Sequence, residues 1–146
     1  MNRFVALHNA AVARIEALLS IDLIALATRF GIGAVFWYSG RTKVDASFHV
    51  TDAAIALFAD EYRLPLVAPA LAAHAAAYAE HLFPLLLALG LLTRASALAL
   101  LGMTFVIEVF VYPDAWPTHL SWAALLLMLL RWGGGRLSLD RVFGLR

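Results

Sequence analysis

The sequence contains four long apolar stretches, and neighbouring stretches are joined by short turns or by one longer polar loop. A transmembrane helix needs about 20 predominantly apolar residues, because a bilayer core is about 30 Å thick and a helix rises about 1.5 Å per residue. The predicted spans lie at about residues 18–39, 66–92, 95–112 and 116–132. Four spans with short connections predict an all-α fold, an integral membrane antiparallel four-helix bundle that forms a single domain over residues 1–146.

The composition agrees with a membrane protein and excludes several kinds of chemistry. Hydrophobic residues make up 63% of the chain and charged residues 14%, against about 45 to 50% and about 25% in a soluble domain. The net charge of +1 provides no basic surface, so nucleic-acid binding is excluded. Without cysteine the chain has no disulfide, thiolate metal site or cysteine-ligated iron–sulfur cluster. Any redox chemistry would therefore depend on a bound cofactor, a quinone or a partner protein.

Two amphipathic helices are expected outside the spans. Residues 4–18 repeat apolar side chains at helical spacing, which predicts a helix at the membrane interface or leading into the first span. In the first loop, Thr51 is a candidate N-cap for a short helix with Ile55, Phe58 and Tyr62 on one face. We expect this second amphipathic helix to lie flat on the bilayer.

Basic residues are distributed unevenly between the two ends of the predicted bundle. One side receives seven arginines, namely Arg3, Arg14, Arg94, Arg131, Arg136, Arg141 and Arg146. The other side receives three basic residues, Arg41, Lys43 and Arg63. Cytoplasmic loops carry an excess of Lys and Arg, so both termini are predicted to be cytoplasmic. The loop that holds Thr51 then faces the periplasm or the cell exterior.

Each predicted span carries an ionisable residue at a similar depth, and these residues are Arg29, Glu80, Glu108 and His119. Counted from the cytoplasmic ends at about 1.5 Å per residue, they lie about 16, 18, 20 and 20 Å deep. A charge at the bilayer centre costs about 2.5 to 3.5 kcal/mol, so the segment around Glu80 needs neighbouring helices to cover that side chain. We therefore predict one buried polar layer with a contribution from each helix.

The charges in this layer do not balance. Arg29 is always protonated and can neutralise one carboxylate, which leaves either Glu80 or Glu108 without a partner. The remaining carboxylate would become neutral unless His119, His81 or a metal ion offsets its charge. The layer is therefore a place where a proton or a cation could reside. The alternative is purely structural, with Arg29 and one glutamate clamping two helices together.

Further polar residues follow one face of the second span. His74, Tyr78 and His81 are spaced i, i+4 and i+7, which suits residues that line a cavity or ligate metal or haem iron. Histidines satisfied between helices are the favoured interpretation of the same spacing.

On the third span, Thr104, Glu108 and Tyr112 form a similar stripe that should face the bundle interior. Trp37, in an aromatic belt at the end of the first span, is a further candidate for binding a ligand. The candidate metal ligands are His119, Glu108 and His74, although a bound metal is favoured less than a quinone.

Three segments carry short motifs in a fixed order. The first runs from Arg29 to Gly40 and Lys43, with an arginine, a glycine, aromatic residues and then Gly-x-x-Lys. The second joins Glu80 to the turn from Leu89 to Ala95, and the third runs from Gly135 to Asp140. Their order and spacing resemble the DoxX family over nearly the whole chain from residue 20 onward. The motif residues that match position by position are Arg29, Gly40, Lys43, Glu80 and Arg94.

The resemblance implies a four-span protein of the bacterial inner membrane. The family takes its name from a membrane subunit of a thiosulfate:quinone oxidoreductase, and other relatives are linked to oxidative-stress or metal-responsive gene clusters. An association with membrane redox chemistry is therefore implied, without a catalytic residue. No Ser-His-Asp arrangement, P-loop or HExxH motif occurs in the sequence, so whether the protein is an enzyme stays open.

Three hypotheses remain open. The first is a subunit or accessory of a membrane redox complex, with a quinone headgroup bound at the polar layer in a cavity that opens toward lipid. The second is a non-catalytic docking or assembly module that recruits other membrane or periplasmic proteins through the loop from Ile55 to Tyr62. The third is a small cation- or metal-handling protein in which carboxylates and histidines hold the ion. Homo-oligomerisation is compatible with all three.

Overall fold

The computed structural model describes residues 2–145, and every regular element in that range is helical. The α-helices are α1 (Arg3–Leu18), α2 (Ile21–Arg41), α3 (Asp52–Leu57), α4 (Pro69–Leu89), α5 (Thr93–Val106), α6 (Trp116–Trp132) and α7 (Leu139–Val142). Two π-helical segments, η1 (Phe58–Tyr62) and η2 (Ile107–Val111), and one 3-10 turn, η3 (Pro113–Ala115), extend or join them. The prediction of an all-α fold is confirmed. Arg146, which was counted in the charge distribution, lies outside the described residues.

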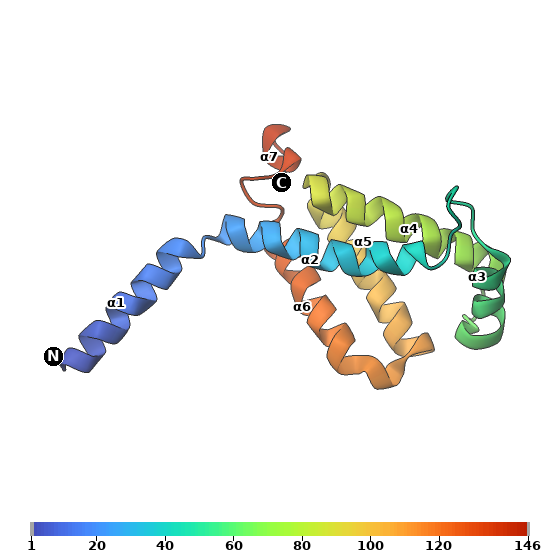
Figure 1. Cartoon of the computed structure of the whole chain (residues 1–146), viewed down its shortest axis with the longest axis horizontal. Coiled ribbons are helices and arrows are strands. Elements are labelled where there is room, and N and C mark those ends of the chain that lie inside the picture. Colours follow the sequence, from blue (N-terminus) through green and yellow to red (C-terminus); the bar gives the residue numbers. More distant parts are fainter. Residues whose placement is uncertain (1, 146) are drawn as a thin grey trace.

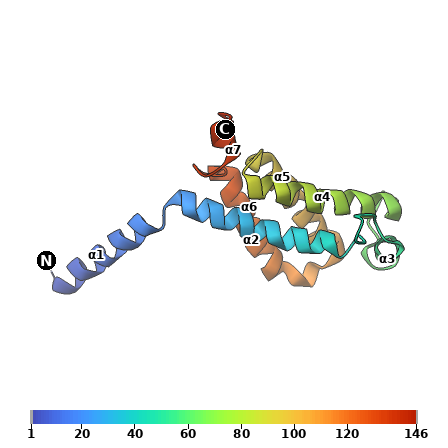
Figure 2. The ribbon, with the colours of Figure 1, turned by 45° about the horizontal axis from the view of Figure 1, so that its top comes forward.

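Helices α2, α4, α5 and α6 form the bundle (Figure 1). Helix α2 packs against α4 and α5 packs against α6, while α4 also contacts α5 and α2 also contacts α6. The view in Figure 2 shows the α5–α6 pair inclined to the α2–α4 pair, with α1 leading away from all four. No residue of α1 is buried. The amphipathic helix expected at residues 4–18 is therefore present and packs against no other part of the described chain.

Local sequence signals account for several helix ends. The Ser20 hydroxyl accepts a hydrogen bond from the Leu23 amide and starts α2, and Thr51 caps α3 through the Ala54 amide, as predicted. Gly90, with φ of +66°, ends α4 in the left-handed conformation, so the Leu91 amide can bond back to the Leu86 carbonyl. Only the short turn Gly90–Leu92 then separates α4 from α5, which makes the two helices antiparallel neighbours.

Three helical segments are long and apolar enough to cross a membrane, namely α2, α4 and the continuous stretch Thr93–Val111 formed by α5 and η2. Helix α6 has 17 residues, a length of about 26 Å at about 1.5 Å per residue, slightly below a bilayer core of about 30 Å. Large apolar side chains cover the outside of the four helices, and examples are Phe30, Leu82, Phe105 and Leu120. An apolar exterior of this kind is stable in lipid rather than in water, so the chain is an integral membrane protein.

The core of the bundle is a cluster of buried apolar side chains from all four helices. Its members are Ile32, Phe36, Leu87, Ala97, Leu100, Leu126 and Leu129. Small residues allow α2 and α4 to approach closely: a Cβ on Gly33 would lie 3.6 Å from the Pro84 carbonyl oxygen. This close packing fixes how α2 and α4 are aligned along their length.

The amphipathic segment α3–η1 packs its apolar face on α4. Its apolar residues Phe58, Ile55 and Tyr62 pack against Ala72 and Ala73 of α4. Its apolar face is covered by the alanine surface at the start of α4, and its position on the bilayer surface stays a prediction. The segment lies at the end of the bundle where α4 begins (Figure 1).

Candidate functional site

Arg29 does not pair with either glutamate. Its buried guanidinium, 2% exposed, donates hydrogen bonds to the carbonyl oxygens of Leu87 and Ala88 at 2.8 and 3.0 Å, in the last turn of α4. It also donates to the carbonyl oxygens of Gly134 and Leu137 at 2.8 and 2.7 Å. The predicted ion pair of Arg29 with Glu80 or Glu108 is wrong. The free carbonyls at a helix C-terminus carry partial negative charge and satisfy a buried arginine without a carboxylate.

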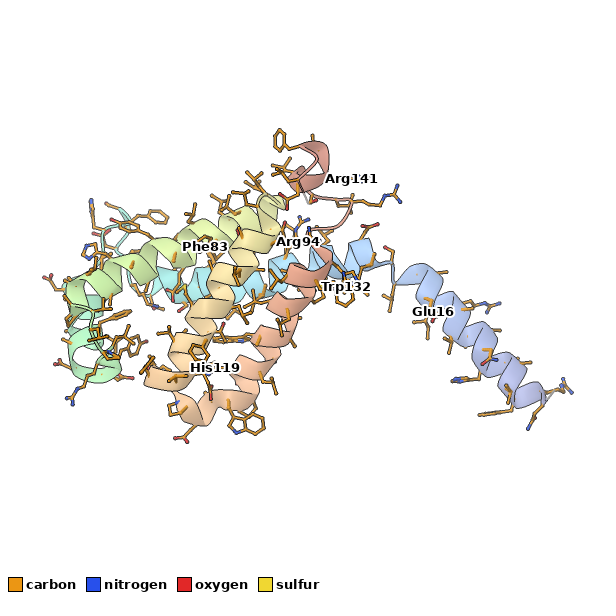
Figure 3. All side chains as sticks on the ribbon, turned by 180° about the vertical axis from the view of Figure 1, so that it is seen from behind. Glu16, Phe83, Arg94, His119, Trp132 and Arg141 are labelled. Atoms are coloured by element: carbon orange, nitrogen blue, oxygen red, sulfur yellow. The ribbon has the colours of Figure 1, made fainter. Side chains whose placement is uncertain are left out.

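The same end of the bundle holds two more charged residues that bond to helix ends. The Asp140 carboxylate accepts the amides of Leu92 and Thr93 at 2.6 and 2.9 Å, at the start of α5. Arg94 donates to the carbonyl oxygens of Leu130 and Arg131 at the end of α6. In Figure 3, Arg94 lies beside the end of α6 near Trp132. Together Arg29, Arg94 and Asp140 bond to helix termini and stabilise the end of the bundle that holds the α4–α5 turn.

Glu80 pairs with Lys43 instead of Arg29. The Lys43 Nζ lies 2.7 Å from the Glu80 Oε2, and both side chains are at most 5% exposed. The Ser39 hydroxyl donates to Glu80 Oε1 at 3.2 Å, and Lys43 Nζ also donates to the carbonyl and hydroxyl oxygens of Ser39. Among described residues, Oε2 accepts no well-aligned hydrogen bond. Because Ser39 is ten residues beyond Arg29 on α2, this cluster lies about 15 Å farther along the helix.

Close helix packing explains why a glycine occupies position 40, between Ser39 and Lys43. A Cβ on Gly40 would lie 2.9 Å from His81 Cε1 and 3.0 Å from the Glu80 Cβ. Only glycine lets α2 approach α4 closely enough here for Ser39 and Lys43 to reach Glu80. In the Gly-x-x-Lys motif, Gly40 therefore allows the close helix contact and Lys43 provides the positive charge that pairs with Glu80.

Glu108 and His119 form a separate pair near the α5–α6 connection. The Nδ1 of His119 lies 2.6 Å from Oε2 of Glu108. The His119 side chain is 6% exposed and that of Glu108 is 31% exposed. Figure 3 shows His119 between α5 and α6, and its ring packs on Trp122 with centroids 5.1 Å apart. The predicted single layer is thus divided into this pair, the Lys43–Glu80 pair and the distant Arg29.

A partly enclosed cavity of about 720 Å³ lies between α2, α4, η1, α5 and α6. Its walls are mainly apolar, with Val35, Ala76, Met103 and Val106 among them. Its polar lining residues are Ser39, Lys43, Tyr62, Glu80, Tyr112 and His119. Ligand pockets commonly have volumes of about 300 to 1,000 Å³ with few polar groups in apolar walls. The structure therefore brings Glu80 and His119 to one cavity and leaves Arg29 and Glu108 outside its lining.

Tyr62 and Tyr112 line this cavity near the segments η1 and η2. Tyr112 donates a hydrogen bond to Glu61 at 2.5 Å, and the rings of Tyr62 and Tyr112 meet edge to face with centroids 5.7 Å apart. Burial raises the pKa of Tyr62 above its ordinary value. The Tyr62 phenol therefore stays protonated at neutral pH and can donate a hydrogen bond.

Other candidates lie outside the cavity. His74 bonds through Nδ1 to the Ala70 carbonyl of its own helix, and Tyr78 is largely exposed. His81 bonds to the Ala77 carbonyl and packs edge to face on Trp37 with centroids 4.9 Å apart. Neither Trp37 nor the three residues of the α4 face line the main cavity.

The expected polar stripe on the third span is also divided. Thr104 is buried and bonds to the Leu100 carbonyl, whereas Tyr112 is 42% exposed. All three residues line spaces between the bundle helices: Thr104 and Glu108 line a smaller cavity between α5 and α6, and Tyr112 lines the main cavity.

A metal site receives little geometric support. Within residues 2–145, no group of three or more His, Asp or Glu side chains is close enough to hold an ion. Glu108 and His119 are adjacent, but the third candidate ligand, His74, bonds to its own helix on α4.

Sequence reasoning missed two partners. Lys43 follows the end of α2 and was placed outside the membrane, although its long flexible side chain extends back to Glu80. Asp140 lies 48 residues from Leu92 and carries no local signal of its capping role. Lys43 ends the first family motif and Asp140 ends the third. These motifs were the sequence signal that included both residues.

The DoxX family model matches residues 24–113, which is more than half of the 146 residues. The matched segment contains Arg29, Ser39, Lys43, Glu80 and Glu108. His119 and Asp140 lie beyond it. No curated protein and no solved structure matches the chain.

Proposed function

Because this chain belongs to the DoxX family, we propose that it is a subunit or accessory of a membrane redox complex and binds a quinone in the cavity of about 720 Å³. The observation that carries the proposal is the combination of this cavity with a buried polar cluster in its wall. A quinone has an apolar ring and tail, which suit the apolar walls, and two carbonyl oxygens that need hydrogen-bond donors.

The cavity lining provides suitable donors from different helices. His119 can donate from α6 and Tyr62 from η1, whereas Lys43 and Ser39 line the same cavity and donate to the Glu80 carboxylate. Glu80 is held by Lys43 at 2.7 Å and by Ser39, so this cluster supplies the charged part of the cavity wall. Arg29 takes no part in this binding, and its role is to stabilise the end of the bundle that holds the α4–α5 turn.

The test is quinone binding by the purified protein in lipid nanodiscs. A short-tailed quinone should raise the melting temperature of the wild type in a concentration-dependent manner. Ala79→Trp fills the cavity from α4, because Ala79 lines it, and should abolish the shift. Ala70→Trp adds the same side chain at an exposed position of the same helix and should retain it. No quinone-dependent shift in the wild type would refute the proposal.

We further propose four membrane crossings with both termini in the cytoplasm of a bacterial inner membrane. The contacts of Asp140 with the start of α5 and of Arg29 with Gly134 support the fourth crossing, because they return the chain after α6 to the level of the α4–α5 turn. The chain has no native cysteine, so single-cysteine variants test this cleanly. Asp52→Cys should react with an impermeant maleimide in whole cells whose outer membrane is permeabilised, and Arg141→Cys should react only after lysis. Labelling of Arg141→Cys in intact cells would refute this topology.

A docking or assembly module is the alternative that one specific observation favours. Helix α1 buries none of its residues, so it is free to meet another surface, whereas the α3–η1 face proposed earlier is covered by α4. Deleting residues 2–18 should then leave the quinone-dependent shift intact and reduce assembly with a partner complex. If assembly were unchanged, α1 would have no docking role.

A further inference from the structure

His119 forms a partition between two cavities. Besides the main cavity, a second one of about 350 Å³ lies between α5 and α6. Its lining residues are Leu101, Thr104, Phe105, Glu108, Trp116, His119, Leu120 and Ala123. Among the residues that the structure describes, His119 is the one that lines both cavities. Glu108 lines only the second, and Glu80 and Lys43 line only the main cavity.

The two ring nitrogens of His119 have different surroundings. Nδ1 is 2.6 Å from the Glu108 carboxylate on the side of the second cavity. Nε2, at the other side of the ring, makes no hydrogen bond with any described residue and is not fully buried. An imidazole can accept a proton on one nitrogen and release one from the other. His119 is therefore placed to pass protons between the two spaces.

Glu108 is the member of the pair that lies closer to the surface of the protein. It lies three residues before the end of η2, about 4.5 Å along a helix with a rise of about 1.5 Å per residue, and its side chain is 31% exposed. His119 is three residues after the start of α6. The pair is therefore close to the outer end of the bundle, where interfacial water can reach the carboxylate.

We propose that Glu108 and His119 form a proton path from the second cavity to a ligand in the main cavity, a role that rests on the proposed quinone site. Glu108, protonated from water, gives its proton to Nδ1 while Nε2 releases its proton to the ligand oxygen. Glu108 is left as a carboxylate that accepts a hydrogen bond from Nδ1. Water carries the proton from Nδ1 back to Nε2, which restores the starting tautomer, and water reprotonates Glu108.

Full reduction of a bound quinone needs two electrons and two protons. In the test an external reductant, dithionite, supplies the electrons. Proton delivery then limits the rate of quinone reduction when the path through Glu108 and His119 is blocked. Other titratable groups face the main cavity, namely Lys43 from the end of α2, Glu80 from α4, Tyr62 from η1 and Tyr112 after η2. Among the described residues, Glu108 and His119 are the titratable groups that line the second cavity. Removing the Glu108 carboxylate therefore isolates the path without altering the quinone contacts.

The experiment measures stopped-flow reduction of a bound short-tailed quinone in nanodiscs, with binding checked by thermal shift. Glu108→Ala should reduce the rate at least tenfold, in line with the contribution of about 10² to 10⁴ typical of a positioned acid or base. Formic acid, which fits the space that the side chain leaves, should restore it. Asp114→Ala removes an exposed carboxylate near the same turn and should change nothing. Glu108→Gln keeps the size of the side chain and should be as slow as Glu108→Ala, with a wild-type melting temperature.

Three outcomes overturn the inference. Unchanged reduction in Glu108→Ala with normal quinone binding refutes the proton path and leaves the quinone site standing. Slow reduction without rescue by formic acid assigns Glu108 a structural role and also refutes the path. Absence of any quinone-dependent shift in the wild type refutes the quinone site itself, and with it the path that serves it.

Discussion

Lys43→Met removes the partner of a buried carboxylate and should be among the most destabilising single changes in the protein. Lys43 is the sole lysine of the chain, its Nζ lies 2.7 Å from Glu80 Oε2, and the two side chains are 5% and 3% exposed. Removing one member of a buried ion pair costs about 3 to 5 kcal/mol, because the remaining charge stays buried without compensation. Replacing both members by apolar side chains of similar volume is often neutral.

A double-mutant cycle separates these effects. Lys43→Met and Glu80→Met should each lower the free energy of unfolding by about 3 to 5 kcal/mol, while the double variant should recover most of that loss. Reversible unfolding in mixed micelles with increasing dodecyl sulfate, followed by helical circular dichroism, measures all four proteins. Arg14→Met on the exposed helix α1 is the control for loss of a cation. A double variant whose loss equals the sum of the single losses would refute the reasoning, because the two side chains would then act independently.

Three further predictions concern other parts of the bundle. Arg29→Leu removes four hydrogen bonds to helix-end and loop carbonyls and should lower the free energy of unfolding by about 3 kcal/mol or more, because each bond from a charged donor contributes about 1.5 to 3 kcal/mol and the bonds do not simply add. The same dodecyl sulfate titration measures this loss. A loss below about 1 kcal/mol would contradict the assigned role of Arg29. Gly40→Val places a Cβ within 3.0 Å of His81 and Glu80 and should cost about 1 to 3 kcal/mol by overpacking, whereas Gly102→Val, where a Cβ meets nothing within 4 Å, should cost much less. Burial raises the pKa of Tyr62, so the stability that the protonated phenol contributes to the fold is fully present below the unfolded pKa of about 10 and is lost as pH rises through the raised pKa. The difference in ultraviolet titration between wild type and Tyr62→Phe measures the pKa of this phenol. A titration of Tyr62 at or below pH 10 would contradict the prediction.

The sequence by itself determined the helices. Apolar length and helical spacing are local properties, and they predicted the helices that became α1, α2, α4, α5 with η2, and α6, to within a few residues. The Thr51 cap was also readable, because a cap bonds within its own first turn. Burial of Arg29, Glu80 and His119 followed from the cost of a charge in lipid, and all three are buried.

Only the tertiary structure decided which polar groups meet. Depths counted along separate helices assume that the helices begin at one level, but Arg29 meets the last turn of α4 while Ser39 meets Glu80 near its middle. That stagger is set by the close packing at Gly33 and Gly40, which depends on two helices at once. The charges alone predicted a pair of Arg29 with Glu80 or Glu108, because backbone carbonyls carry no formal charge and Lys43 extends inward from a loop. The partner of a buried charge is a property of the packed bundle, where any donor or acceptor within about 3 Å can satisfy it.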